Sequence, residues 1–128
     1  MMKFEDLIGI PFVDGGRNSS GLDCWGLAME MYKRQGIVLP DYPVSAMAVD
    51  SIANELAANE ASWIKLDSPE IGCLVVLRFA CGNWANHVGV YIGDGKFIHA
   101  YIKTGVCIDR LSHWRSRIAG FYKPGWIK

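Results

Sequence analysis

The sequence predicts an α+β fold in which helices pack on one small antiparallel sheet. Helical periodicity is confined to the first half of the 128 residues, and strand-like segments follow one another in the second half. Hydrophobic residues make up 51% of the chain and charged residues 20%, a balance typical of globular proteins. At this length we expect residues 1–128 to form a single domain.

The helices are expected in three places. A short helix is predicted over residues 3–9 and an amphipathic one over residues 23–35, where apolar residues recur at helical spacing. Asp23 or Ser20 can cap the second helix, because a short polar side chain accepts hydrogen bonds from unpaired amides at a helix start. A third helix is predicted over residues 46–58.

The strands are expected after residue 70, where β-branched and aromatic residues alternate with small and polar ones. They are predicted over residues 73–79, 87–92, 96–102, 105–109 and 118–123. Because these segments are close together in the sequence, we expect antiparallel pairing.

Charge and hydropathy exclude several classes of partner. Thirteen basic residues balance thirteen acidic ones, so no electrostatic footprint for nucleic acid is expected. No apolar run approaches the roughly 20 residues that span a bilayer, so no membrane association is expected. Glu5 and Asp6 stand where a signal peptide carries basic residues, and we therefore expect synthesis in the cytoplasm without a secretory signal.

Four cysteines lie at positions 24, 73, 81 and 107, without a Cys-x-x-Cys pair. Without an export signal, a disulfide framework is not expected, and the last three are interpreted as small buried hydrophobic residues. Cysteines and histidines lack the closely spaced chelating pair of structural zinc sites. We expect no metal and no cofactor.

Cys24 differs from the other cysteines because it falls in the first turn of the helix over residues 23–35. Unpaired amides and the helix dipole stabilise an anion at that end, which favours a thiolate nucleophile. Gly21 and Gly26 flank the cysteine and are interpreted as leaving space for an approaching peptide. A buried cysteine on the apolar helix face is the alternative.

Two histidines lie on a predicted hairpin, His87 at the start of one strand and His99 within the next. A two-residue Asp94–Gly95 turn would pair Gly93 with Lys96 and place the histidines on opposite faces.

A three-residue loop would instead pair Ile92 with Lys96 and Val90 with Ile98. This register is predicted because it gathers the aliphatic side chains on one face, namely Val88, Val90, Ile98 and Ala100. His87 and His99 then share the other face, close enough for a hydrogen bond between their side chains. In this arrangement Cys24 would be the nucleophile, His87 the base and His99 the residue that orients the base.

The residues in three blocks resemble the NlpC-type cell-wall cysteine peptidases, which have a papain-like fold. The blocks are residues 9–16, 22–27 and 87–100, with Pro69-Glu70-Ile71-Gly72 as a further match. The resemblance implies a catalytic triad in which Cys24 is the nucleophile, His87 the base and His99 the third polar member. It also implies hydrolysis of the γ-D-glutamyl–diamino acid bond in peptidoglycan stem peptides.

Four residues are candidates for substrate binding. The resemblance assigns Asp23 to the substrate amine, and Trp25 and Trp84 are expected to line the cleft. Phe12 stands where the family usually has Tyr, so a hydroxyl near the reacting carbonyl is lost, and Trp25 replaces the Ser usual in secreted members.

The Asp-Cys-Trp-Gly-Leu form at residues 23–27, with Leu39-Pro40-Asp41-Tyr42 downstream, resembles the phage tail-assembly branch of the family. That resemblance implies phage tail proteins as partners and a route to the wall on a phage particle. Two alternatives stay open: an amidase or acyltransferase with another acyl substrate, and a tail or scaffold component without catalysis.

Overall fold

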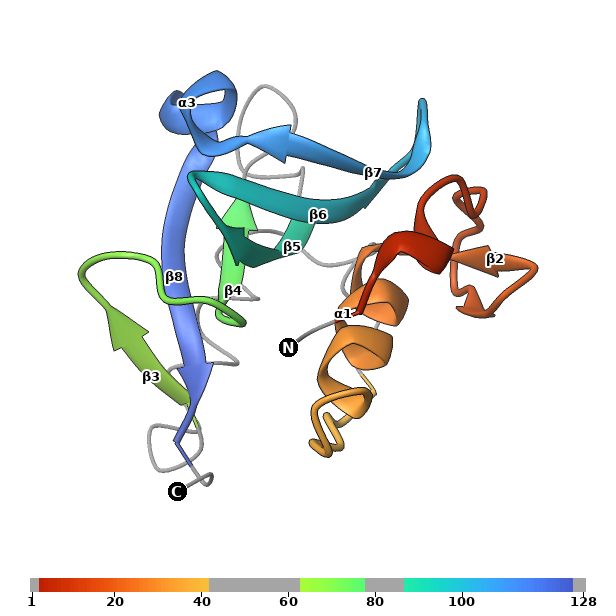
Figure 1. The fold of residues 1–128 in the computed structure, drawn as a ribbon, viewed down its shortest axis with the longest axis horizontal. Helices are drawn as coiled ribbons and strands as arrows, with labels where there is room; N and C mark the ends of the chain where they lie inside the picture. The colour runs from red at the N-terminus through yellow and green to blue at the C-terminus, as the bar shows by residue number, and fades with distance from the viewer. Residues whose placement is uncertain (1–2, 42–62, 78–86, 126–128) are drawn as a thin grey trace.

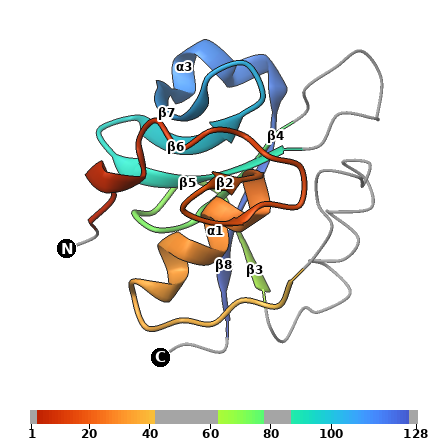
Figure 2. The same cartoon turned by 90° about the vertical axis from the view of Figure 1, so that its right-hand side faces the viewer.

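The computed structural model describes residues 3–41, 63–77 and 87–125, and they form the predicted α+β fold (Figure 1). A ten-residue helix packs against a six-stranded antiparallel sheet, and a two-stranded sheet lies beside the start of that helix (Figures 1 and 2). The sheet strands are β3 (Trp63–Leu66), β4 (Leu74–Leu77), β5 (His87–Gly93), β6 (Lys96–Tyr101), β7 (Gly105–Arg110) and β8 (Ile118–Pro124). The smaller sheet pairs β1 (Arg17–Asn18) with β2 (Gly21–Leu22).

The helix α1 (Cys24–Lys33) begins one residue after its Asp23 cap and ends two residues before the predicted boundary at residue 35. Its apolar face is buried against β5 and β6, as the periodicity predicts. The helix predicted over residues 3–9 is a single 3₁₀ turn, η1 (Glu5–Leu7), and the one predicted over residues 46–58 lies outside the described residues. None of the helices in the described ranges is long and apolar enough to cross a membrane.

The order of strands in the large sheet is β3-β8-β4-β5-β6-β7. Consecutive strands from β4 to β7 are neighbours, whereas β8 inserts between β3 and β4. β3 was not predicted, because its four residues are too few to establish an alternating pattern. Four other short elements were also not predicted, namely β1, β2, the one-turn helix α3 (Leu111–Trp114) and the 3₁₀ turn η3 (Arg115–Arg117).

The hairpin of β5 and β6 combines features of the two registers considered above. Val90 pairs with Ile98, as predicted, but Gly93 rather than Ile92 pairs with Lys96. The connection is the two-residue turn Asp94–Gly95, in which both residues have positive φ. A bulge between Tyr91 and Gly93 absorbs one residue, so the buried aliphatic face is preserved despite the shorter turn.

The two faces of the sheet have different cores. Val88, Val90, Ile98 and Ala100 belong to the larger core beneath α1, together with Leu27 and Met31 of the helix. The opposite face carries the smaller core of Val75, Leu77 and Phe97. Since side chains alternate along a strand, His87 and His99 lie on the face that bears Phe97.

The segment before β1 is joined to β7 by close backbone contacts. The amide of Val106 donates to the carbonyl oxygen of Ile10 at 2.9 Å, and that of Gly9 donates to Val106 at 2.9 Å. A Cβ atom at Gly105 would collide with the Ile10 carbonyl, and the residue has a φ of +74°. Gly95 has a similar φ of +72°, but a Cβ there meets open space.

Substitution of these two glycines by alanine separates strain from collision. Gly95→Ala is expected to lower the free energy of unfolding by about 1–2 kcal/mol, the cost of a left-handed conformation. Gly105→Ala is expected to cost at least about 1 kcal/mol more, since the collision adds an overpacking penalty. Urea unfolding of both variants measures the difference, and equal losses would contradict the close contact with Ile10.

Candidate active site

Cys24 is the first residue of α1 and is 1% exposed. The backbone amides of Val88 and Trp25 interact with its thiol, and Val88 directly follows His87 in β5. The thiol therefore lies where the start of the helix meets the start of the strand that carries the predicted base.

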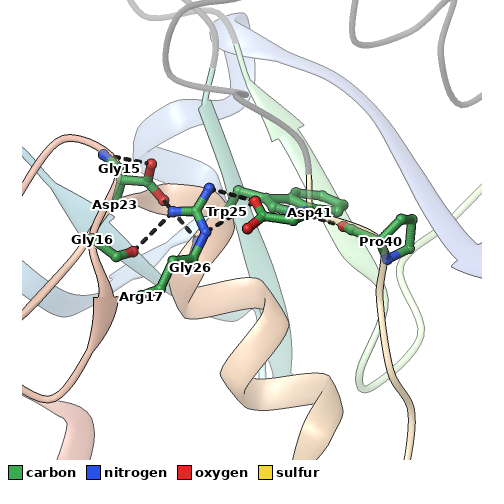
Figure 3. Close-up of polar contacts among 8 residues, drawn as sticks. All are labelled: Gly15, Gly16, Arg17, Asp23, Trp25, Gly26, Pro40 and Asp41. Atoms are coloured by element: carbon green, nitrogen blue, oxygen red, sulfur yellow. Dashed lines mark hydrogen bonds and ion pairs between the residues drawn. The ribbon is translucent and has the colours of Figure 1, made fainter.

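The start of α1 is fixed by the carboxylate of Asp23, which is 1% exposed (Figure 3). One oxygen accepts from the amide of Gly26 at 2.7 Å and from the Arg17 guanidinium, and the other accepts from the amide of Gly15 at 3.1 Å. These bonds satisfy an unpaired amide of the helix and hold the loop over residues 13–16 against it. Of the two caps considered, Asp23 is the one that forms.

Arg17 joins the Asp23 cap to the chain that follows α1. Its guanidinium also donates to Asp41 at 2.8 Å and to the carbonyl oxygen of Gly16 at 2.9 Å (Figure 3). Hydrogen bonds and ion pairs with Asp41 and Asp23 outweigh partial burial and raise the pKa of Arg17. Sequence reasoning missed this residue, because nothing in the spacing of an isolated arginine indicates which carboxylates it will meet.

The interpretation of Gly21 and Gly26 as space for substrate is wrong. A Cβ atom at Gly26 would collide with the carbonyl oxygen of Gly16, and one at Gly21 would collide with the side chain of Val13. Both glycines therefore admit the protein's own loop before β1, rather than a substrate peptide.

His87 and His99 contact each other as the register predicts. Nε2 of His87 lies 2.7 Å from Nδ1 of His99, and the rings are nearly perpendicular, with centroids 4.9 Å apart. His87 is 3% exposed and His99 is fully buried. Gly89 is opposite His99 in the hairpin, where any larger side chain would press on the ring of Phe97.

Asp109 extends this pair to a chain of three residues. Its Oδ2 lies 2.7 Å from Nε2 of His99, and Asp109 is on β7, the edge strand that pairs with β6. Sequence reasoning missed Asp109. This residue follows Cys107 by two positions, and Cys107 pairs with His99 across the strands, but that relation is informative only once the β6–β7 register is known.

The hydrogen bonds define which nitrogen carries each proton. A carboxylate only accepts, so Nε2 of His99 donates to Asp109. In a neutral imidazole the other nitrogen then accepts, so Nδ1 of His99 accepts from Nε2–H of His87. The remaining nitrogen of His87, Nδ1, keeps its lone pair and can act as a base.

Burial keeps the reacting groups neutral in the free protein, so the thiolate expected from the position of Cys24 at a helix start is not the resting form. Burial raises the pKa of Cys24 to about 12, against the opposing effect of the Val88 amide. Burial and the neighbouring His99 hold the pKa of His87 well below its usual value. Burial also lowers the pKa of His99, and the hydrogen bond to Asp109 opposes that shift.

The other predicted site residues lie in varied environments. Trp25 is fully buried, and its Nε1 donates to the carbonyl oxygen of Pro40 at 2.8 Å, so its position gives no support to a cleft wall (Figure 3). Asp23 is enclosed by the bonds described above, and Phe12 is half-buried and bridges to Leu22. Trp84 lies outside the described residues. All four substrate-binding roles stay predictions.

The described cysteines, Cys24, Cys73 and Cys107, are free thiols. Cys73 is buried, as expected, and Cys81 lies outside the described residues. The interpretation of Cys107 as a buried hydrophobic residue is wrong. It is partly exposed because β7 is an edge strand with one open side. Its sulfur lies 3.6 Å from Nε2 of His99, with which it pairs across the strands.

The sequence profile of the NlpC/P60 family matches residues 9–123 of this chain. A murein DD-endopeptidase and LD-carboxypeptidase of Escherichia coli K12, MepS, is 26% identical over 91% of the chain and 57% of its own length. A γ-D-glutamyl-L-lysine dipeptidyl-peptidase of Bacillus subtilis is 31% identical over 82% of the chain and 32% of its own length.

A crystal structure of an NlpC/P60 family protein from Bacillus cereus superposes with a TM-score of 0.65 at 26% identity. The match covers 90% of this chain and 35% of that protein. The chain thus spans between about a third and just over half of the length of these relatives.

Proposed function

This chain belongs to the NlpC/P60 family, and on that premise we propose that it is a cysteine peptidase acting on peptidoglycan stem peptides. The observation that carries the proposal is the hydrogen-bonded chain His87–His99–Asp109, which begins at the residue before Val88, whose backbone amide contacts the Cys24 thiol. Two relatives, named for murein and for a γ-D-glutamyl-L-lysine bond, support this substrate class.

The reaction begins with proton transfer from the thiol of Cys24 to Nδ1 of His87. The sulfur attacks the scissile carbonyl carbon, and amides in the first turn of α1, including that of Cys24, donate to the developing oxyanion. His87, now an imidazolium, gives the proton to the leaving amine as the C–N bond breaks. Water then attacks the thioester, and a free acid and the original thiol result.

The neutral resting state has a consequence for this mechanism. A thiol and an imidazole, rather than a separated ion pair, await the substrate, so the charge separation arises only during attack. His99 and Asp109 act as positioning residues, since their hydrogen bonds hold the ring of His87 and leave its Nδ1 as the nitrogen that accepts the thiol proton in this mechanism.

The finer assignment is the bond cleaved. We propose the amide between γ-D-glutamate and the diamino acid, as the resemblance implies and as the name of the Bacillus subtilis relative supports. A free γ-carboxyl on D-glutamate and a free α-amine on the diamino acid would be the products.

A product assay with defined stem tripeptides tests this function. The parent protein should release the free diamino acid, and the γ-carboxyl group of the D-glutamate product should contain one oxygen from labelled water. The rate of Cys24→Ala should be lower by about 10³-fold or more, since this variant lacks the nucleophile. Cys73→Ala removes another buried cysteine, one without a place in the mechanism, and should retain the activity.

Other outcomes of that assay separate the alternatives. Products joined to an added amine or alcohol, without incorporation of labelled oxygen, would identify an acyltransferase. No turnover of any wall peptide by a folded parent protein would contradict the peptidase and favour an assembly component.

Replacement of Asp109 tests the positioning role. Asp109→Asn should lower kcat about tenfold to hundredfold with little change in KM, a typical loss when a partner that orients a functional histidine is removed. Asp67→Asn is the matched control on an exposed aspartate. Equal effects on kcat and KM, or none on either, would contradict the role.

The pH profile gives an independent readout. The base must be neutral, and the pKa of His87 is lowered, so kcat/KM of the parent should persist as the pH falls through 6.5 and decline only at lower pH. An acidic limb centred above pH 6.5 would contradict a buried neutral His87.

We further propose that the chain is a component of phage particles, as the resemblance of residues 23–27 and 39–42 to the phage tail-assembly branch implies. Two contacts join these segments. Trp25 donates to Pro40, and Asp41 binds Arg17, which also binds Asp23. Mass spectrometry of purified particles from the source tests this proposal. Detection of the chain with tail proteins is expected, and its absence from particles that contain all other tail proteins would contradict it.

A further inference from the structure

Three metal-binding side chains meet on the outer side of the His87–His99 pair. Nε2 of His99, Sγ of Cys107 and Oδ2 of Asp109 all lie within 4.8 Å of one another. The separations are 2.7 Å for His99–Asp109, 3.6 Å for His99–Cys107 and 3.9 Å for Cys107–Asp109. The cross-strand pairing of His99 with Cys107 produces this cluster from residues that the sequence separates.

The distances suit a tetrahedral zinc ion. Zinc bonds of about 2.0–2.3 Å place neighbouring ligand atoms about 3.3–3.8 Å apart. Two of the three separations are within or close to that range, and the third requires Asp109 to move outward by about half an ångström. Asp109 has room for that movement, because its side chain is 33% exposed.

The donor set and its access also fit zinc. Thiolate and imidazole together favour zinc over magnesium or calcium, which prefer oxygen. Burial and the carboxylate of Asp109 raise the pKa of Cys107, and the hydroxyl of Thr104, 3.2 Å from the sulfur, opposes that shift, so a bound cation would have to displace the thiol proton. Cys107 and Asp109 are partly exposed on an edge strand, so an ion reaches Nε2 of the fully buried His99 from their side.

We propose that His99, Cys107 and Asp109 form an inhibitory zinc site, with water as the fourth ligand. The metal takes the Nε2 lone pair of His99, so the ring proton moves to Nδ1, and the thiol of Cys107 releases its proton to solvent. Nδ1–H of His99 then donates to Nε2 of His87. His87 keeps one proton, now on Nδ1, and the lone pair that would receive the proton of Cys24 is lost.

The inhibition rests on the proposed peptidase function, whereas the metal site does not. Cobalt(II) is a spectroscopic substitute for zinc, and its bond to a thiolate absorbs in the near ultraviolet. In Cys24→Ala, which removes the competing nucleophilic thiol, titration with cobalt should produce this band. The double variant Cys24→Ala/Cys107→Ser should lack the band, and zinc should displace the cobalt in the single variant.

Two spectroscopic results would overturn the site. One is the absence of a thiolate–cobalt band in folded Cys24→Ala, and the other is an unchanged band in the double variant, which would assign the metal to another cysteine. Both results are independent of peptidase activity, so a failure of the proposed function is distinguished from a failure of the site.

Inhibition is measured as the zinc concentration that halves each protein's own zinc-free rate. In Cys107→Ser this concentration should rise about tenfold or more. Removal of a residue that only supports a metal ligand typically lowers metal affinity by that factor, and removal of a ligand should lower it at least as much. Equal inhibition of the parent and Cys107→Ser would place the inhibitory zinc elsewhere, at Cys24 and His87, and would overturn the proposal.

Discussion

The pairing of β5 with β6 is the constraint on which the candidate site depends. One face of the hairpin must bury Val88, Val90, Ile98 and Ala100 beneath α1, and this requirement allows one register. The bulge near the turn shows how strong the requirement is, because the chain departs from regular pairing rather than expose that face. The imidazoles of His87 and His99 meet on the other side as a result. The apolar core therefore determines the geometry of the two imidazoles, which lie on the opposite face of the same strands.

A second constraint is electrostatic. The site is buried, so a charge on Cys24, His87 or His99 is disfavoured, and hydrogen bonds rather than ion pairs must order the groups. A single acceptor, the carboxylate of Asp109, is sufficient to set the direction of every bond in the chain. The lone pair of His87 is thus controlled from a strand that neither the thiol nor the base occupies.

Local pattern was sufficient for some of this architecture and insufficient for the rest. Pattern in the sequence predicted α1 and the strands from β4 to β8, and the buried aliphatic face of β5 and β6 also predicted the contact between His87 and His99. Asp109 and Arg17 could not be predicted, since each acts through partners that only the tertiary fold brings near. The glycines beside Cys24 were misinterpreted for a related reason: space left by a missing side chain does not reveal what fills it, and here the protein's own loop does.

The position of β8 affects how the chain reaches this fold. β3 and β4 do not pair with each other, and the strand that joins them, Ile118–Pro124, is the last to be synthesised among the described strands. A ribosome-bound chain can complete the hairpins from β4 to β7 early, but β3 must wait for a partner more than fifty residues downstream. Such a distant pairing carries an entropic cost of loop closure, and non-local pairing slows folding. The sheet therefore closes last, and a chain truncated before residue 118 would leave both β3 and one edge of β4 as unpaired, aggregation-prone strands.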